Sequence, residues 1–256
     1  MNKILFFDID GTLLNFDKKI PNSTKEAIHL ARNNGHTIAI ATGRSPFMFN
    51  ELREELQVDT YVGLNGQLVV FNNEILDKHP IDKTSLTKLV DYANHKGHSM
   101  VFLDEKQMVA TNEADDKIQT AIGSLKFPYP EKKQDFHLTN DVFQALIFSG
   151  VEEEMIYKKQ FNDFHFLRWH EHSFDVIPTE ASKARGIIRL ANLLGFEMGN
   201  VFAFGDGLND VPMLRAAGVG IAMGNGVTEA KEVADYVTNH VDEDGIYNAL
   251  KHFKLI

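Results

Sequence analysis

The fold of this chain is decided by the stretch KILFFDIDGTLLN, residues 3–15. Residues 4–7 are a short, continuous apolar run with β-branched and aromatic side chains, which is typical of a strand buried on both faces. Side chains two positions apart on a strand point to the same side, so Asp8 and Asp10 are expected to project together from its carboxyl end. Two carboxylates about 4 Å apart repel by roughly 4 kcal/mol at an effective dielectric near 20. The stretch therefore predicts a site that holds a cation.

Strands and helices alternate after this opening run. Apolar segments at 36–43 and 60–66 are expected to be strands, and the segments at 22–34 and 46–56 are expected to be helices. Such alternation is typical of a parallel sheet with crossover helices on both faces, whose ligands bind beyond the carboxyl ends of the strands. The polar residues expected at those ends are Asp8, Asp10, Thr42, Gly43, Arg44 and Asn65.

The first expected helix has a sequence signal at its start. Asn22 or Ser23 is expected to be the N-cap, with Glu26 placed to complete a capping box. Gly35 is expected to end this helix.

The alternation stops near Pro80 and resumes at Lys183. Between these points a helix followed by a hairpin occurs twice, at 82–111 and 151–178, which indicates a separate α+β unit. The sheet of the α/β domain then draws on both ends of the chain, so the α+β unit is an insertion. The expected domains are a discontinuous α/β core, residues 1–80 with 181–256, and an inserted domain, residues 81–180.

Composition sets limits on the class of protein. The 256 residues, 43% hydrophobic and 24% charged, are typical of a globular protein with one large domain or two modest ones. The chain has no cysteine, which excludes disulfides, thiolate zinc sites and a cysteine nucleophile. The net charge of −10 argues against nucleic-acid binding, which needs a basic surface. No apolar stretch of about 18 residues and no signal peptide are recognised, so no membrane association and a cytoplasmic location are expected.

A second acidic group follows a later apolar run in FAFGDGLND, residues 202–210. Asp206 comes directly after the expected strand, with Asn209 and Asp210 close behind it. Magnesium prefers six oxygen ligands, commonly one or two carboxylates, waters and a substrate phosphate. Asp8, Asp206 and one backbone carbonyl near Asp10 could supply the protein's share of these ligands.

Taken separately, these motifs leave several interpretations open. An aspartate pair of the D-x-D type is common in loops, and it also holds the metal in nucleotide-sugar transferases. An EF-hand is excluded because Gly11 comes too early for its frame. A structural Ca²⁺ site stays open. The presence of DIDGT, ATGR, an isolated lysine and GDGLND in this order favours a catalytic site.

The ordered motifs resemble those of the haloacid dehalogenase superfamily, and more narrowly its Cof-type phosphatases. The motifs are DIDGTLL (8–14), ATGR (41–44), SKARGI (182–187) and GDGLNDVPML (205–214), followed by AGVGIAMGN (217–225). The resemblance covers nearly the whole chain. It implies a Rossmann-like core, and it implies that the insertion is the α/β cap that such phosphatases carry between their second and third motifs.

The resemblance implies roles for four catalytic residues. Asp8 would be the nucleophile that attacks phosphorus and forms an aspartyl-phosphate. Asp10 would be the general acid and base. Thr42 would bind the phosphoryl oxygens, and Lys183 would neutralise charge on the nucleophile and on the transferring group.

The same resemblance implies a Mg²⁺ site and substrate contacts. Asp206 would hold the ion together with Asp8 and the Asp10 carbonyl, and Asp210 would support that site. Asn209 would contact phosphate or orient Lys183. Further substrate contacts are expected from the site-edge residues Gly43, Arg44 and Asn65.

Several of these substrate assignments have alternatives. Arg44 binds phosphate or substrate, or it pairs with an acidic neighbour. Asn65 is a ligand candidate, but with Gly66 it is also consistent with a simple tight turn. In the insertion, Arg168, Trp169 and His170 are candidates for contacting the leaving group.

The function that the resemblance implies is a Mg²⁺-dependent phosphatase acting on a small phosphorylated metabolite. The substrate classes of the family are sugar phosphates, nucleotides and phosphorylated cofactors. Two alternatives stay open: a phosphotransferase such as a phosphomutase, and a non-catalytic module that binds a phospho-ligand. The protein is expected to be a monomer or a homodimer.

Overall fold

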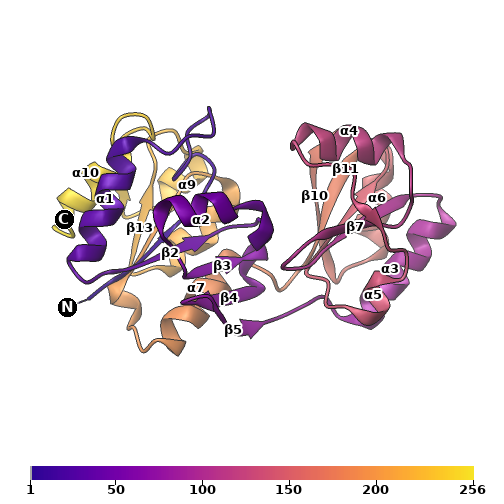
Figure 1. Ribbon diagram of the computed structural model, residues 1–256, viewed down its shortest axis with the longest axis horizontal. Coiled ribbons are helices and arrows are strands. Elements are labelled where there is room, and N and C mark those ends of the chain that lie inside the picture. Colours follow the sequence, from indigo (N-terminus) through magenta and orange to yellow (C-terminus); the bar gives the residue numbers. More distant parts are fainter. Residues whose placement is uncertain (1) are drawn as a thin grey trace. The chain divides into compact units, whose positions relative to one another are not determined.

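The computed structural model describes residues 2–256, and the chain divides into two compact units (Figure 1). The core unit comprises the described residues up to Arg44, Met48–Lys78 and Ser182–Ile256. The inserted unit comprises Ser45–Phe47 and His79–Ala181. The core unit thus draws on both ends of the chain.

The core unit is built on an eight-stranded sheet with the strand order β14-β13-β12-β1-β2-β3-β4-β5. The strands from β14 to β3 are parallel, and β4 and β5 are added antiparallel. The strands are β1 (Ile4–Phe7), β2 (Thr37–Ala41), β3 (Tyr61–Gly63), β4 (Leu68–Phe71), β5 (Glu74–Lys78), β12 (Val201–Gly205), β13 (Val219–Ala222) and β14 (Tyr236–Val237). Strand β1 is central and pairs with β12 and β2, so all four of its residues are buried.

Helices cover both faces of this sheet. Ile4 and Phe6 of β1 belong to an apolar cluster with residues of α7, α8 and α9. The alternate side chains, Leu5 and Phe7, point to the opposite face. Helices α1 and α10 contact each other (Figure 1). The helices are α1 (Asn22–Asn33), α2 (Asn50–Leu56), α7 (Lys183–Leu193), α8 (Val211–Ala216), α9 (Thr228–Val233) and α10 (Gly245–His252). This α/β architecture confirms the predicted fold class.

Two local features differ from the sequence predictions or were not foreseen. Helix α1 begins after Pro21 and has no side-chain cap, so the predicted capping box at Asn22 or Ser23 is wrong. Proline at that position already fixes φ near the helical value. The β4–β5 hairpin was not predicted. Its turn residues Asn72 and Asn73 both have positive φ, 50° and 64°, which is the conformation of a type I′ turn.

The inserted unit contains a six-stranded sheet with the order β10-β11-β9-β6-β7-β8, antiparallel except for the β7–β8 pair. Its strands are β6 (Ser99–Leu103), β7 (Met108–Ala110), β8 (Glu131–Lys132), β9 (Gln144–Phe148), β10 (Phe164–His170) and β11 (Ser173–Pro178). Its helices are α3 (Lys83–His95), α4 (Asp116–Ser124), α5 (Phe136–Thr139) and α6 (Val151–Gln160).

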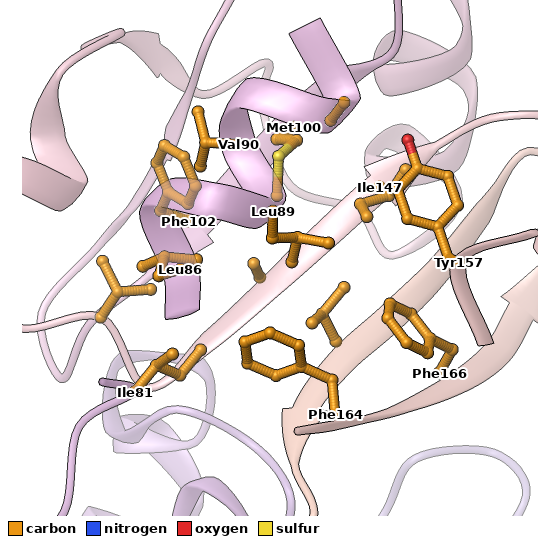
Figure 2. Close-up of a cluster of buried hydrophobic side chains, with 14 of the residues drawn as sticks. Ile81, Leu86, Leu89, Val90, Met100, Phe102, Ile147, Tyr157, Phe164 and Phe166 are labelled. Carbon is orange, nitrogen blue, oxygen red and sulfur yellow. The ribbon is translucent and has the colours of Figure 1, made fainter. Parts of the chain in front are cut away.

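The inserted unit has a hydrophobic core of its own. Leu86 and Leu89 of α3 pack against Phe102 of β6, Ile147 of β9 and Tyr157 of α6 (Figure 2). Such a separate core is what a unit needs to be compact by itself.

No helix within residues 2–256 is both long enough and apolar enough to span a bilayer.

Candidate active site

The polar residues predicted from the motifs gather at one edge of the core sheet. Asp8 directly follows β1, Thr42 follows β2 and Asp206 follows β12. Because these three strands are parallel neighbours, their carboxyl ends meet at the same edge. Buried apolar strands thereby place polar side chains in a fixed arrangement.

Lys183 joins two of the carboxylates. It is the first residue of α7, whose N-cap is Ser182, and its side chain is 1% exposed. Its Nζ donates to Asp8 Oδ1 and to Asp210 Oδ1, each at 2.6 Å. The other oxygen of Asp210 accepts from the backbone N–H groups of Asp206 and Gly207. Asp210 therefore holds both the lysine and the loop that carries Asp206.

Burial changes the charge balance of this group. Burial raises the pKa of Asp8 to about 7, opposed by the charge of Lys183. Burial, together with repulsion from Asp210, raises the pKa of Asp206 to about 6. Burial by itself would lower the pKa of Lys183, but the carboxylates of Asp8 and Asp210 raise it above its usual value. The ammonium is charged at neutral pH, and the carboxylates are short of positive partners.

The residues present fit a divalent cation. Asp8, Asp206 and Asp210 each offer an oxygen, and the three oxygens lie within 4.8 Å of one another. Asp206 Oδ1 accepts from Thr12 Oγ1 at 3.1 Å. A Cβ atom at Gly11 would lie 2.2 Å from Asp206 Oδ2, so glycine is what leaves room for this carboxylate. A hard oxygen donor set of this kind suits Mg²⁺.

The carboxylate of Asp10 lies in a different network. Arg44 donates to it twice, Nε to Oδ2 at 3.0 Å and Nη2 to Oδ1 at 2.6 Å. Lys18 Nζ donates to Oδ1 at 2.7 Å. Burial by itself would raise the pKa of the Asp10 carboxyl. The charges and hydrogen bonds of Arg44 and Lys18 outweigh burial and hold this pKa below its usual value. Of the two interpretations of Arg44, the structure shows the pairing with an acidic neighbour.

The loop after β2 is shaped by its own side chains. The Arg44 N–H donates to Thr42 Oγ1, and the Asn65 N–H donates to the Thr42 carbonyl, both at 3.1 Å. A Cβ atom at Gly43 would lie 2.9 Å from Asn65 Oδ1. Thr42, Gly43 and Asn65 are therefore brought together. Asn209 is exposed, and its Oδ1 lies over Gly207.

Three further residues shape the site and were not singled out from the sequence. Thr12 lies within the quoted motif and contacts Asp206. Lys18 contacts Asp10. Asn225 Nδ2 donates to the Gly11 carbonyl at 2.7 Å, and its Oδ1 accepts from the Val241 N–H. Only Thr12 and Asn225 stand inside recognised motifs, so a motif signal existed for these two alone.

Residues 5–250 match the model of the haloacid dehalogenase-like hydrolases. The chain belongs to this family. It is a phosphatase of the Cof type, as the predicted resemblance implied.

Individual relatives and solved structures that the chain resembles are also named as phosphatases. The chain is 44% identical to YkrA of Bacillus subtilis (strain 168), named provisionally as a phosphatase, over 100% of this chain and 99% of YkrA. It is 29% identical to the B. subtilis 5-amino-6-(5-phospho-D-ribitylamino)uracil phosphatase YcsE, over 99% and 96% of the two chains. It resembles the solved subclass IIB sugar phosphatase BT4131, with a TM-score of 0.83 and 32% identity over 99% and 100% of the chains.

Proposed function

We propose that this chain is a Mg²⁺-dependent phosphatase that hydrolyses a small phosphorylated metabolite through an aspartyl-phosphate on Asp8. The observation that carries the proposal is the position of Asp8. Its Oδ1 accepts from the buried Lys183, while its carboxylate belongs to the acidic group with Asp206 and Asp210. A nucleophilic carboxylate needs positive charge beside it when it approaches a phosphate dianion.

The bound cation would be held by Asp8, Asp206 and the Asp10 carbonyl, with Asp210 in support. It supplies positive charge that offsets the charges of the phosphate and the nucleophile. Lys183 supplies a second positive charge at Asp8 Oδ1. Thr42 and the neighbouring backbone N–H groups would hold the phosphoryl oxygens, with Gly43, Asn65 and Asn209 at the edge of the same site.

Two chemical steps follow from these roles. In the first, an oxygen of Asp8 bonds to phosphorus as the bond from phosphorus to the leaving oxygen breaks, and the leaving oxygen takes a proton from Asp10, whose protonated form the negative charge of a bound phosphate would favour. In the second, Asp10 takes a proton from a water molecule, whose oxygen bonds to phosphorus as the bond to Asp8 breaks. Proton transfer by a placed carboxyl group contributes about 10²–10⁴-fold to such steps.

The substrate we propose is a primary phosphate on a polyhydroxylated carbon chain. BT4131 is named a sugar phosphatase, and the name of YcsE describes a phosphorylated ribityl chain. The inserted unit is proposed to act as the cap that selects the leaving group. Domains that close over an active site commonly exclude water during the reaction.

The test is phosphate release from a panel of phosphorylated compounds with and without Mg²⁺. The panel contains ribose 5-phosphate, glucose 6-phosphate, flavin mononucleotide, pyridoxal phosphate, a nucleoside monophosphate and 4-nitrophenyl phosphate. Metal-dependent release that disappears in Asp8→Asn is expected. Isomerisation of a phosphosugar faster than release would favour a phosphomutase, and binding without turnover of any compound would favour a binding module.

A further inference from the structure

The Asp10 carboxylate is contacted by cations from two different loops of the core unit. Arg44, after β2, occupies both of its oxygens, and Lys18 adds a contact to Oδ1 at 2.7 Å. Arg44 was already a candidate from its motif, whereas Lys18 lies in the segment between β1 and α1 and has no assigned role. A carboxylate contacted from two directions keeps one orientation, while a carboxylate with one partner is freer to rotate.

Lys18 is presented to Asp10 by an ordered turn. The side-chain oxygen of Asn15 accepts from the N–H groups of Asp17 and Lys19, at 3.1 and 3.0 Å. The backbone of Asn15 also bonds to Lys18 and Lys19. Lys18 itself has φ of +59°, a left-handed conformation that lysine adopts rarely. The hydrogen bonds of Asn15 thus stabilise a backbone conformation that is unfavourable for a lysine by itself.

The turn is also attached to the C-terminal part of the core unit. Asn15 Nδ2 donates to Asp242 Oδ1 at 2.8 Å. At the other end of the segment, Asn225 Nδ2 donates to the Gly11 carbonyl at 2.7 Å. Gly11 and Asn15, which lie between Asp10 and Lys18 in the chain, are therefore both attached to the C-terminal part of the core unit. These two attachments limit how the lysine and the carboxylate can move relative to each other.

We propose that Lys18 is a positioning residue that, together with Arg44, holds the Asp10 carboxylate in the orientation from which it exchanges protons with the leaving oxygen and with water. This inference rests on the proposed function. The Lys18 side chain is 62% exposed, and exposed ion pairs are weak. The contact of Lys18 can therefore open when Asp10 Oδ1 exchanges a proton, and it reforms afterwards.

The two chemical steps allow this role to be tested. The 4-nitrophenolate group leaves without needing a proton, so the first step with 4-nitrophenyl phosphate does not depend on Asp10. The second step still requires Asp10 to take a proton from water. A displaced Asp10 therefore slows only the second step with this substrate, whereas a displaced Asp8 slows the first.

The experiment compares Lys18→Met with Lys19→Met by rapid-mixing kinetics in Mg²⁺. Lys19 is a matched control because it belongs to the same turn, contributes its backbone to the Asn15 contacts, and loses the same charge. In Lys18→Met, we expect a burst of 4-nitrophenol with a rate constant within about twofold of the control, followed by steady-state turnover about tenfold slower. For the fastest alkyl phosphate of the panel, kcat should fall about tenfold with KM changed less than about threefold, and Lys18→Arg should restore both.

Three results would overturn the inference. The first is a steady-state rate in Lys18→Met equal to that of Lys19→Met. The second is a slower burst in Lys18→Met, which would show a general disturbance that includes Asp8. The third is that wild type releases phosphate from no compound, which overturns the proposed function and the inference with it. Normal wild-type turnover with an unaffected Lys18→Met overturns the inference alone.

Discussion

The two units bury charged side chains in different ways. In the core unit, one buried cation, Lys183, serves both Asp8 and Asp210, and Asp206 lies beside them. In the inserted unit, Arg168 pairs with the buried Glu154 at 2.7 Å. The guanidinium of Arg168 also donates to the carbonyls of Gly150, His170 and Glu171. The first group has excess negative charge, whereas the Glu154 carboxylate of the second has two cationic partners, since Lys158 Nζ also lies 2.6 Å from its Oε1.

This difference separates a reactive site from a structural contact. Buried carboxylates without enough partners cost stability, and such groups gather where a cation or a substrate completes the charge balance. A buried carboxylate whose oxygens both have cationic partners instead holds together the elements that supply those partners. Arg168, considered from the sequence as a leaving-group contact, uses its donors to join β10 to the start of α6.

The largest expected effect is the loss of activity when Lys183 is replaced, compared with replacement of Arg168. Lys183→Met should lower kcat about a thousandfold, because it removes a positive charge that faces the nucleophile. It should also lower the free energy of unfolding by about 3–5 kcal/mol, because buried carboxylates lose their partner. Arg168→Met should destabilise the inserted unit while kcat per folded molecule stays near that of wild type. Urea unfolding measures the free energy of unfolding. Turnover divided by the concentration of active sites, found by titration, gives kcat.

A comparable loss of kcat in both variants would contradict this separation. It would mean that Arg168 also takes part in the reaction. Retention of more than about a tenth of wild-type kcat by Lys183→Met would remove the lysine from the proposed catalytic group.

A smaller effect is expected from a methyl group beside the acidic site. Gly11 has φ of +77°, and its Cβ in Gly11→Ala would lie 2.2 Å from Asp206 Oδ2, so the carboxylate must move. The concentration of Mg²⁺ that gives half-maximal activity should rise about 10–100-fold. Gly97→Ala in the inserted unit is the control, since Gly97 has φ of +69° with nothing within 4 Å of the added methyl.

The two alanine variants share the cost of a left-handed backbone, about 1 kcal/mol. Only Gly11→Ala also displaces a candidate ligand. An unchanged Mg²⁺ dependence in Gly11→Ala would show that Asp206 does not hold the ion.

The last expected effect concerns stability alone, with no change in catalysis: a pH dependence in the inserted unit. Burial raises the pKa of Asp175 from 3.8 to about 7, opposed by a hydrogen bond with Gln144. Between these values the folded chain holds a proton that the unfolded chain has lost. This contribution to stability is present below the unfolded pKa and is lost as pH rises through about 7. Asp175→Asn should therefore be more stable than wild type at about pH 8 and similar at about pH 4.

Urea unfolding of both proteins across this range measures the difference. Asp8 and Asp206 also have raised pKa values, but they are present in both proteins, so the difference reports on Asp175. Parallel stability curves would contradict the assignment.

Much of the core fold was predictable from local patterns. The buried run at β1 and the polar residues after β1, β2 and β12 predict that Asp8, Thr42 and Asp206 share one sheet edge, and the structure has them there. The β4–β5 hairpin was missed although Asn72 and Asn73 carry a turn signal, because β5 is largely exposed and lacks an apolar run.

The pairing of charges was less accessible from the sequence. The contacts of Arg44 and Lys18 with Asp10 depend on how two loops fold back over one sheet edge, and neither spacing nor periodicity encodes this. Likewise, Lys183 lies 175 positions from Asp8 along the chain. Its relation to Asp8 came from a family resemblance and not from a local pattern.

The proposed mechanism places the phosphoryl group on Asp8 during turnover, and that group can be trapped. Asp10→Asn is mixed with 4-nitrophenyl phosphate and Mg²⁺, quenched in acid, and examined by intact mass and peptide mapping. We expect a mass increment of one phosphoryl group located on Asp8, and no increment in the double variant that also carries Asp8→Asn. An increment on another residue, or none while wild type turns over the same substrate and Asp10→Asn still releases 4-nitrophenol, would contradict it.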